Sequence, residues 1–260
     1  MNILDKIVLR KKEEVAHAKQ LVSVQDLEKG EHFNRTPYSF KEFLLAENRT
    51  GIIAEFKRRS PSKGLINGIA DVAEVTQAYN KAGASAISVL TDVDFFGGKT
   101  DDLLAARAAN TIPILRKDFM IDEYQILEAK AWGADIILLI ASILTPKQIH
   151  DFGKFAKDLG LNVLLEVHDL EELERSFSPN LDAIGVNNRN LGDFTVNIQT
   201  SFDLVEKIPN EFLKISESAI SDPAIINTLK TAGFNGFLIG ENFMKTDNPG
   251  AAIADFVAKM

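Results

Sequence analysis

The sequence contains no cysteine among its 260 residues. This absence excludes disulfides, thiolate metal sites and cysteine nucleophiles. It also fits a reducing compartment, and we expect a cytoplasmic protein. The four histidines, His17, His32, His150 and His168, show no ligand spacing such as HExxH. We therefore predict no metal site and interpret these residues as isolated surface or core histidines.

The chain also lacks an excess of positive charge and any long hydrophobic run. Its formal net charge of −8 argues against a surface that binds the nucleic-acid backbone, so any phosphate must be bound locally. No run approaches the roughly 18 apolar residues of a membrane span. Asp5 and Lys6 stand where a signal peptide would have its apolar core. We expect neither a nucleic-acid nor a membrane partner.

From residue 51 onward the sequence alternates short β-branched apolar runs with longer segments of helical period. This pattern is typical of parallel strands joined by crossover helices. Strands are predicted over 51–56, 84–91, 112–117, 134–141, 161–167, 181–187, 212–216 and 236–239. Helices are predicted over 71–82, 99–109, 122–132, 145–159, 169–176, 198–208, 222–232 and 249–260. The even spacing favours an α/β fold, a closed (β/α)8 TIM barrel, over the alternative of an open doubly wound sheet.

Glycine marks the junction between several predicted helices and the strands that follow them. Gly83, Gly133, Gly160 and Gly233 each occupy such a junction, where the left-handed backbone that ends a helix favours glycine. Capping signals stand where several helices begin: Asp71, Thr145-Pro146 and Asp222-Pro223.

The first 48 residues lie outside the repeat, as an N-terminal helical extension of a single domain that spans residues 1–260. Ile3, Leu4, Ile7 and Val8 indicate an amphipathic helix, and residues 39–45 a second, short one. These helices either plug one end of the barrel or form a roof over the active site, and the sequence leaves both alternatives open.

Charged residues end several of the apolar runs, and the carboxyl ends of barrel strands are where functional groups of this fold lie. Glu55 and Lys57 share one face of the first strand because side chains alternate, and Lys117 shares a face with Leu115. Glu166 interrupts an apolar strand, and a buried unpaired carboxylate costs several kcal/mol. It therefore needs a cation such as Lys57 or Lys117. The alternative is a solvated ion pair at a strand end, which contributes little to stability.

Hydrogen-bonding and basic residues follow the strands around the same end of the predicted barrel. Asn187-Asn188-Arg189 follows the sixth strand and Ser216-Glu217-Ser218 the seventh. Backbone N–H groups of Ser218-Ala219 and Gly240-Glu241 could bind a phosphate, together with a cation from Arg59 or Arg189. The basic segment 57–64 predicts a mobile loop over an anion, with an ordinary solvated loop as the alternative.

Several segments occur in the order typical of one known family. They are 3–8 (ILDKIV), 53–62 (IAEFKRRSPS), 115–119 (LRKDF), 165–168 (LEVH), 184–191 (IGVNNRNL), 216–218 (SES) and 237–240 (FLIG). Through them the chain resembles indole-3-glycerol phosphate synthase of tryptophan biosynthesis along its whole length. The resemblance implies a cofactor-free carboxy-lyase that acts as a monomer on a small phosphorylated substrate, 1-(2-carboxyphenylamino)-1-deoxyribulose 5-phosphate. Ring closure with loss of carbon dioxide and water would give the indole.

The resemblance also implies roles for individual residues. Lys117 would be the general acid that protonates the ketose oxygen, and Lys57 would pair with the benzoate carboxylate. Glu166 and Glu55 would orient the lysines or move protons, and the choice of group for the dehydration stays open. The implied catalytic set is Glu55, Lys57, Lys117, Glu166, Asn187 and Ser218.

The family's phosphate site maps onto Arg59, Arg189, Ser218, Ala219, Gly240 and Glu241, and its aromatic-ring pocket onto Phe96, Phe119, Leu138 and Leu191. Two residues depart from the family's pattern: Ala219 stands where the family often has glycine, and Glu241 where it has serine. If backbone N–H groups bind the phosphate, both changes are tolerated, provided that the Glu241 side chain points away from the dianion.

Two rival interpretations remain. Phosphoribosylanthranilate isomerase is another phosphosugar barrel, but it uses a cysteine base and this chain has none. A catalytically silent barrel that serves as a scaffold would tolerate neutralisation of Lys57, Lys117 and Glu166.

Overall fold

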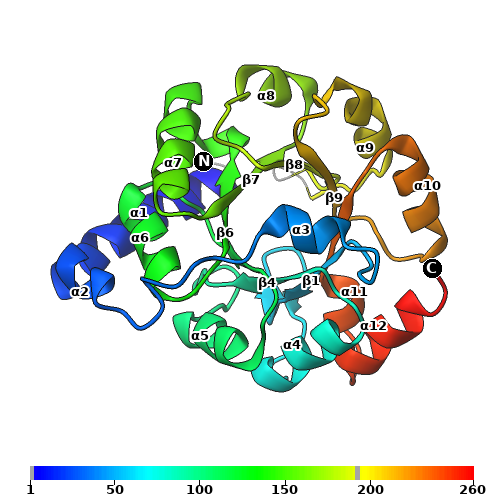
Figure 1. The fold of residues 1–260 in the computed structure, drawn as a ribbon, viewed down its shortest axis with the longest axis horizontal. Coiled ribbons are helices and arrows are strands. Elements are labelled where there is room, and N and C mark those ends of the chain that lie inside the picture. Colours follow the sequence, from blue (N-terminus) through cyan, green and yellow to red (C-terminus); the bar gives the residue numbers. More distant parts are fainter. Residues whose placement is uncertain (1–2, 191–193) are drawn as a thin grey trace.

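The computed structural model describes residues 3–190 and 194–260. In it eight parallel strands close into a barrel in the order β1-β10-β9-β8-β7-β6-β5-β4 (Figure 1). The barrel strands are β1 (Ile52–Phe56), β4 (Ala86–Leu90), β5 (Ile114–Lys117), β6 (Ile136–Ile140), β7 (Asn162–Val167), β8 (Ala183–Asn187), β9 (Leu213–Glu217) and β10 (Gly236–Ile239). This topology confirms the predicted (β/α)8 barrel and excludes the open sheet.

Helices cover the outside of the barrel. They are α4 (Val72–Lys81), α5 (Thr100–Ala109), α6 (Glu123–Ala131), α7 (Pro146–Asp158), α8 (Leu170–Arg175), α9 (Gln199–Leu204), α10 (Ala224–Ala232) and α12 (Pro249–Val257). The predicted caps act at several helix starts: Thr145 and Gln148 form a capping box at α7, and the Asp71 side chain accepts from the Glu74 N–H at α4. Gly233 ends α10 with a φ of 113°, as the glycine pattern predicts.

Several short elements were not predicted. They are a hairpin of β2 (Arg59–Ser60) and β3 (Gly64–Leu65), helices α2 (Val24–Glu28) and α11 (Glu241–Met244), and the 3-10 turns η1 (Ala141–Ile143) and η2 (Val205–Lys207). The predicted helix 198–208 divides into α9 and η2. Two to five residues are too few for a hydrophobic period, so only tertiary contacts define such elements.

Side chains alternate between the inside and the outside of the barrel along every strand. Ile53, Leu115, Leu164 and Ile215 belong to the apolar cluster inside the barrel, whereas neighbours such as Ile52 pack with the surrounding helices. Two residues further along these four strands stand Glu55, Lys117, Glu166 and Glu217. The inward row of each of these four strands therefore ends in a charged residue at the carboxyl end of the barrel.

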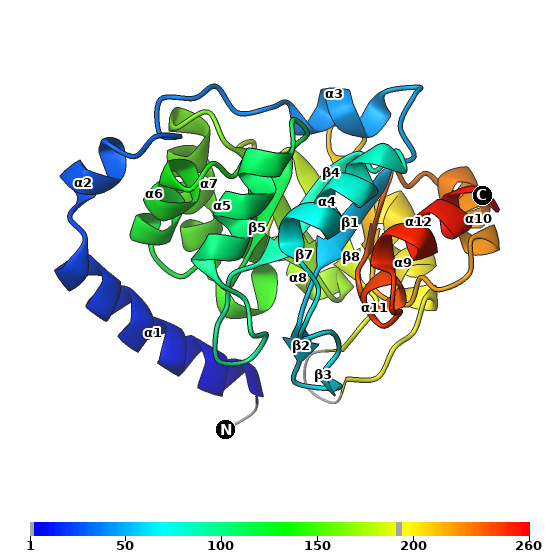
Figure 2. The ribbon, with the colours of Figure 1, turned by 90° about the horizontal axis from the view of Figure 1, so that it is seen from below.

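The N-terminal extension contacts both ends of the barrel (Figure 2). Helix α3 (Phe40–Leu45) lies at the amino-terminal ends of the strands, where Phe40 and Leu44 pack against the interior cluster. Helix α1 (Ile3–Leu21) runs along the outside, and its first turns reach the opposite end, where Ile7 packs in the same cluster as Phe119. Thus α3 is a plug, and only the start of α1 borders the mouth.

Within residues 3–190 and 194–260, no helix is long and apolar enough to cross a membrane.

Candidate active site

A cavity opens at the carboxyl ends of the barrel strands, where the inward rows become charged. Its lining includes these residues: Glu55, Lys57, Phe96, Lys117, Phe119, Leu138, Glu166, Asn187, Arg189, Glu217, Ser218 and Glu241. The structure therefore brings together all six residues of the predicted catalytic set. Among the described residues, no group of three or more His, Asp or Glu is arranged to hold a metal ion.

Lys117 is the centre of the polar side of this cavity. Its Nζ lies 2.6 Å from Glu166 Oε2 and 3.3 Å from Glu217 Oε2. Burial opposes the charged form, but the carboxylates of Glu166, Glu217 and Glu55 raise the pKa of Lys117 well above its ordinary value. Lys117 is thus an ammonium group, able to donate a proton or a hydrogen bond.

The two carboxylates beside Lys117 differ in their ionisation. Burial opposes the charge on Glu166, yet Lys117 and His168 lower its pKa well below the ordinary range, and Asn187 donates to its Oε1 at 3.1 Å. Burial and the charge of Glu166 together raise the pKa of Glu217 to about 7, although Lys117 opposes this rise. Glu166 is therefore a fixed carboxylate, and Glu217 can gain or lose a proton near neutral pH.

Glu55 and Lys57 form a second ion pair at the end of β1, with 2.6 Å between Lys57 Nζ and Glu55 Oε1. Glu55 is buried, and Ser88 on the neighbouring strand donates to its Oε2 at 3.4 Å. Gly240 lies so close to Glu55 that any side chain at this position would meet the carboxylate. Glycine at the end of β10 therefore makes room for the charged pair.

A second cavity adjoins the first beside the ends of β9 and β10. Arg189, Ser218, Ala219, Gly240 and Glu241 line it, in agreement with most of the predicted phosphate site. Ser218 and Ala219 have φ of 65° and 62°, a strained left-handed conformation for residues with a side chain. The short helix α11 begins here, and barrels often bind phosphate at such a helix after their last strands.

The two residues that bear on this phosphate prediction most directly are Glu241 and Arg59. The Glu241 carboxylate lies 3.5 Å from Arg189 and 3.7 Å from Lys63, so it faces the cations. A dianion between them would have to displace this side chain. Arg59 lies on β2 against Gly97 and lines neither cavity in the described part of the chain. Its phosphate contact stays a prediction that requires movement of the β2–β3 hairpin.

Apolar side chains form the wall of the first cavity opposite the charges. Phe96 and Phe119 meet with ring centroids 5.9 Å apart, and Leu138 lines the same space. These three agree with the predicted ring pocket. Leu191, the fourth predicted member, lies outside the described residues.

Glu217 is the main site residue that the sequence prediction omitted. The signal was available, because Glu217 stands two residues after Ile215 and alternation places both inside the barrel. Asn187 and Glu217 are register partners on β8 and β9, which sets them side by side.

His168 differs from its interpretation as an isolated histidine. Its ring nitrogens lie 3.3 Å from Glu166 and 3.0 Å from Glu172. These carboxylates raise the pKa of His168 to about 10 against the effect of burial.

Comparison with known proteins bears on the fold and the family of the chain. A solved structure described as "Native KDPGal structure" matches 82% of this chain and 93% of its own with a TM-score of 0.57, and at 13% identity it supports the fold alone. The chain is 48% identical to indole-3-glycerol phosphate synthase of Bacteroides thetaiotaomicron, over 98% of both chains. It is 42% identical to the enzyme of that name from Bordetella pertussis, over 99% of both. The family model "Indole-3-glycerol phosphate synthase" matches residues 4–256, so the chain belongs to the indole-3-glycerol phosphate synthase family.

Proposed function

We infer that the protein is an indole-3-glycerol phosphate synthase, a carboxy-lyase of tryptophan biosynthesis. It converts 1-(2-carboxyphenylamino)-1-deoxyribulose 5-phosphate into indole-3-glycerol phosphate, carbon dioxide and water. The observation that carries this conclusion for the site is the ammonium group of Lys117, held between two carboxylates of unlike ionisation and facing an aromatic wall.

The two adjoining cavities support one orientation of the substrate. The anilino ring lies against Phe96, Phe119 and Leu138, and the phosphate lies beside Arg189 and the backbone after β9 and β10. Lys57 lines both cavities and can pair with the carboxylate of the substrate. The ketose carbon then lies between the aromatic ring and the phosphate, next to Lys117.

Ring closure joins the ring carbon that bears the carboxylate to the ketose carbonyl carbon. Negative charge develops on the carbonyl oxygen, and Lys117 donates a proton to it. Carbon dioxide then leaves from the same ring carbon, and its bonding electrons restore the benzene ring. Glu166 holds Lys117 in place throughout, and Asn187 in turn holds Glu166 by donating to its Oε1.

The last step removes water. The hydroxyl leaves as water with a second proton from Lys117, which solvent has reprotonated after the ring closure, and the neighbouring CH2 carbon loses a proton to complete the indole. Glu217 is the group we assign to this proton removal, because its pKa of about 7 suits a base at neutral pH. Its Oε1 is buried against Gly185 without a hydrogen-bond partner among the described residues, which disfavours the charged form and is consistent with the raised pKa.

We further propose that the enzyme is one domain over residues 1–260, works as a monomer in the cytoplasm and needs no cofactor. The monomer is what the family resemblance implies.

The function is tested by incubation of purified, chelator-treated protein with the carboxyphenylamino ketose phosphate. Indole fluorescence should rise, with one carbon dioxide released per indole formed. Folded protein that forms no indole would instead support the scaffold interpretation.

A further inference from the structure

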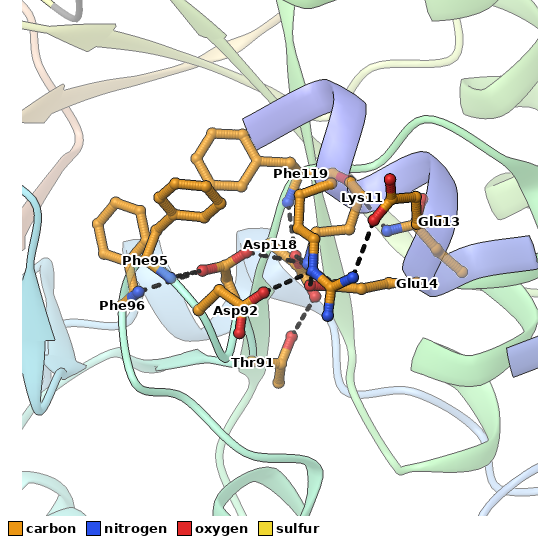
Figure 3. A network of polar contacts seen from close by, with 12 residues as sticks. Lys11, Glu13, Glu14, Thr91, Asp92, Phe95, Phe96, Asp118 and Phe119 are labelled. Atoms are coloured by element: carbon orange, nitrogen blue, oxygen red, sulfur yellow. Dashed lines mark hydrogen bonds and ion pairs between the residues drawn. The ribbon is translucent and has the colours of Figure 1, made fainter. Parts of the chain in front are cut away.

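Lys11 of helix α1 is a buried lysine outside the cavity, with only 4% of its surface exposed. Its Nζ lies 3.0 Å from Asp92 Oδ2, 3.0 Å from Asp118 Oδ1 and 2.6 Å from Glu14 Oε2 (Figure 3). Burial opposes its charge, but these carboxylates raise the pKa of Lys11 well above its ordinary value. The side chain of Lys11 is therefore a charged ammonium group that joins the N-terminal helix to the ends of two strands.

Both aspartates bind the backbone of the aromatic wall. Asp92 Oδ1 accepts from the N–H groups of Phe95 and Phe96 at 2.9 and 3.1 Å, and Asp118 Oδ1 accepts from the N–H of Phe119 at 2.8 Å. Phe96 and Phe119 are the rings that line the cavity. The network in Figure 3 thus runs from Lys11 through two carboxylates to the backbone that sets the positions of these rings.

Lys11 has a particular importance for Asp92. Asp92 is fully buried, and within the described chain Lys11 is the one cation at ion-pair distance from it. Asp118 has further partners, since Arg116 and Thr91 also contact its Oδ2. Loss of Lys11 would leave the Asp92 carboxylate buried without a countercharge, and the loop after β4 would have to move to hydrate it.

The first turns of α1 support the same region by apolar contact. Ile7 is buried in the cluster that contains Phe119, and Ile3, Leu4, Phe95 and Phe96 pack against that cluster. Helix α1 therefore contacts the wall through both its apolar face and a buried charge.

We propose that Lys11 is a positioning residue, which fixes the Phe96–Phe119 wall for the aromatic half of the substrate through Asp92 and Asp118. This inference rests on the proposed function for the identity of the substrate. It predicts that Lys11 affects recognition of the aromatic ring and leaves recognition of the phosphate unchanged.

The test compares Lys11→Met with Lys19→Met. Lys19 also joins α1 to the barrel, through a 2.7 Å ion pair with Asp122, but it is exposed, and Asp122 accepts from the Tyr124 N–H and not from the backbone of Phe95, Phe96 or Phe119. Lys11→Met should raise KM, and the inhibition constant of the product, by about tenfold, the factor for one lost aromatic contact. The inhibition constant of inorganic phosphate should stay at the wild-type value. Lys19→Met should change none of the three.

Amide hydrogen exchange of Phe95, Phe96 and Phe119 gives a readout that needs no activity. These amides should exchange faster in Lys11→Met than in wild type and in Lys19→Met. If Lys11→Met does not fold, Lys11→Arg decides, because it keeps the charge and alters the geometry; it should speed exchange at the same three amides.

Unchanged exchange and unchanged KM in a folded Lys11 variant would overturn the inference, as would an equal rise in the inhibition constants of product and phosphate. Wild-type protein that forms no indole would refute the proposed function alone, and the exchange measurement would still decide the role of Lys11.

Discussion

Glu166 and Glu217 both accept a hydrogen bond from Lys117, yet their surroundings shift their pKa values in opposite directions. Glu166 has two cationic neighbours, Lys117 and His168, and stays ionised. Glu217 shares Lys117 but faces the charge of Glu166, so its proton is held more tightly. Such pairs commonly mark an acid and base assignment. The site therefore holds a fixed anchor for Lys117 and a separate proton acceptor.

Glu217→Gln tests this division of roles. Glu217 is protonated below about pH 7 and a carboxylate above it, so the wild-type kcat should rise with pH through a midpoint near 7. The variant should lose that inflection and about 10²-fold in kcat, the usual scale for a positioned base. Measurement of kcat from pH 5 to 9 checks both. A variant that keeps the inflection would show that another group titrates.

Sequence reasoning finds most of these residues because a charge inside an apolar strand violates its pattern. Glu166 within an apolar run is such a case, and Lys117 follows from its alternation with Leu115. The ion pairs of Lys117 with Glu166 and Glu217 cannot be predicted from the sequence. The distances between these side chains depend on how β5, β7 and β9 stagger around the barrel. Lys11 has no such signal, because a lysine on an amphipathic helix normally faces solvent.

At the scale of elements, the two ends of the barrel have different roles. The carboxyl ends of the strands carry the charged residues, and α3 closes the amino-terminal end with Phe40 and Leu44. Gly236 at the start of β10 lies so close to Leu44 that a side chain there would collide with it. The plug is thus fitted to the barrel and should contribute to stability without a role in the chemistry.

Leu44→Ala should lower the free energy of unfolding by about 2–5 kcal/mol, the range for a buried leucine. The kcat of the folded fraction should not change. Leu45→Ala is the matched control, because Leu45 is 48% exposed in the same helix and should alter stability by no more than about 0.5 kcal/mol. Urea unfolding together with kinetics measures both effects. An equal loss in both variants would contradict the plug.

The eight barrel strands were predictable because most are short apolar runs, and a glycine stands shortly before several of them. The position of the N-terminal helices on the barrel was harder to predict. Its hydrophobic period indicates helices, but the choice between a plug and a roof depends on which barrel surface each helix meets. Asn162 and Asp135 settle the place of α3, since their side chains bind the Phe40 and Tyr38 N–H groups.

At the scale of the whole molecule, a chain of net charge −8 carries Lys57, Lys117 and Arg189 in the cavities at one end of its barrel, next to carboxylates that pair with them. We expect these cations to bind the anionic substrate, and the negative net charge disfavours the binding of polyanions. The buried carboxylates also link stability to pH. Asp118 and Glu166 have pKa values lowered from ordinary values of 3.8 and 4.5. Their contributions are present above those values and are lost as the pH falls below them.

The free energy of unfolding should therefore decline as the pH drops below about 4.5, by up to about 1.4 kcal/mol per pH unit for each proton bound on unfolding. Glu217 acts in the other direction, because its raised pKa lowers stability as the pH rises from 4.5 to about 7. Urea unfolding from about pH 2.5 to about pH 7, which covers these titrations, gives the profile. Asp118→Asn should flatten the acid slope, and an unchanged slope would contradict the assignment.

The most direct test of the proposed reaction compares wild-type protein with Lys117→Ala in one indole-fluorescence assay, with chelator present and saturating ketose phosphate. We expect steady indole formation by the wild type and a kcat lower by about 10² or more in the variant, at equal folded content by circular dichroism. Near-wild-type turnover by Lys117→Ala would contradict the claim that the charged strand ends of this barrel form the indole.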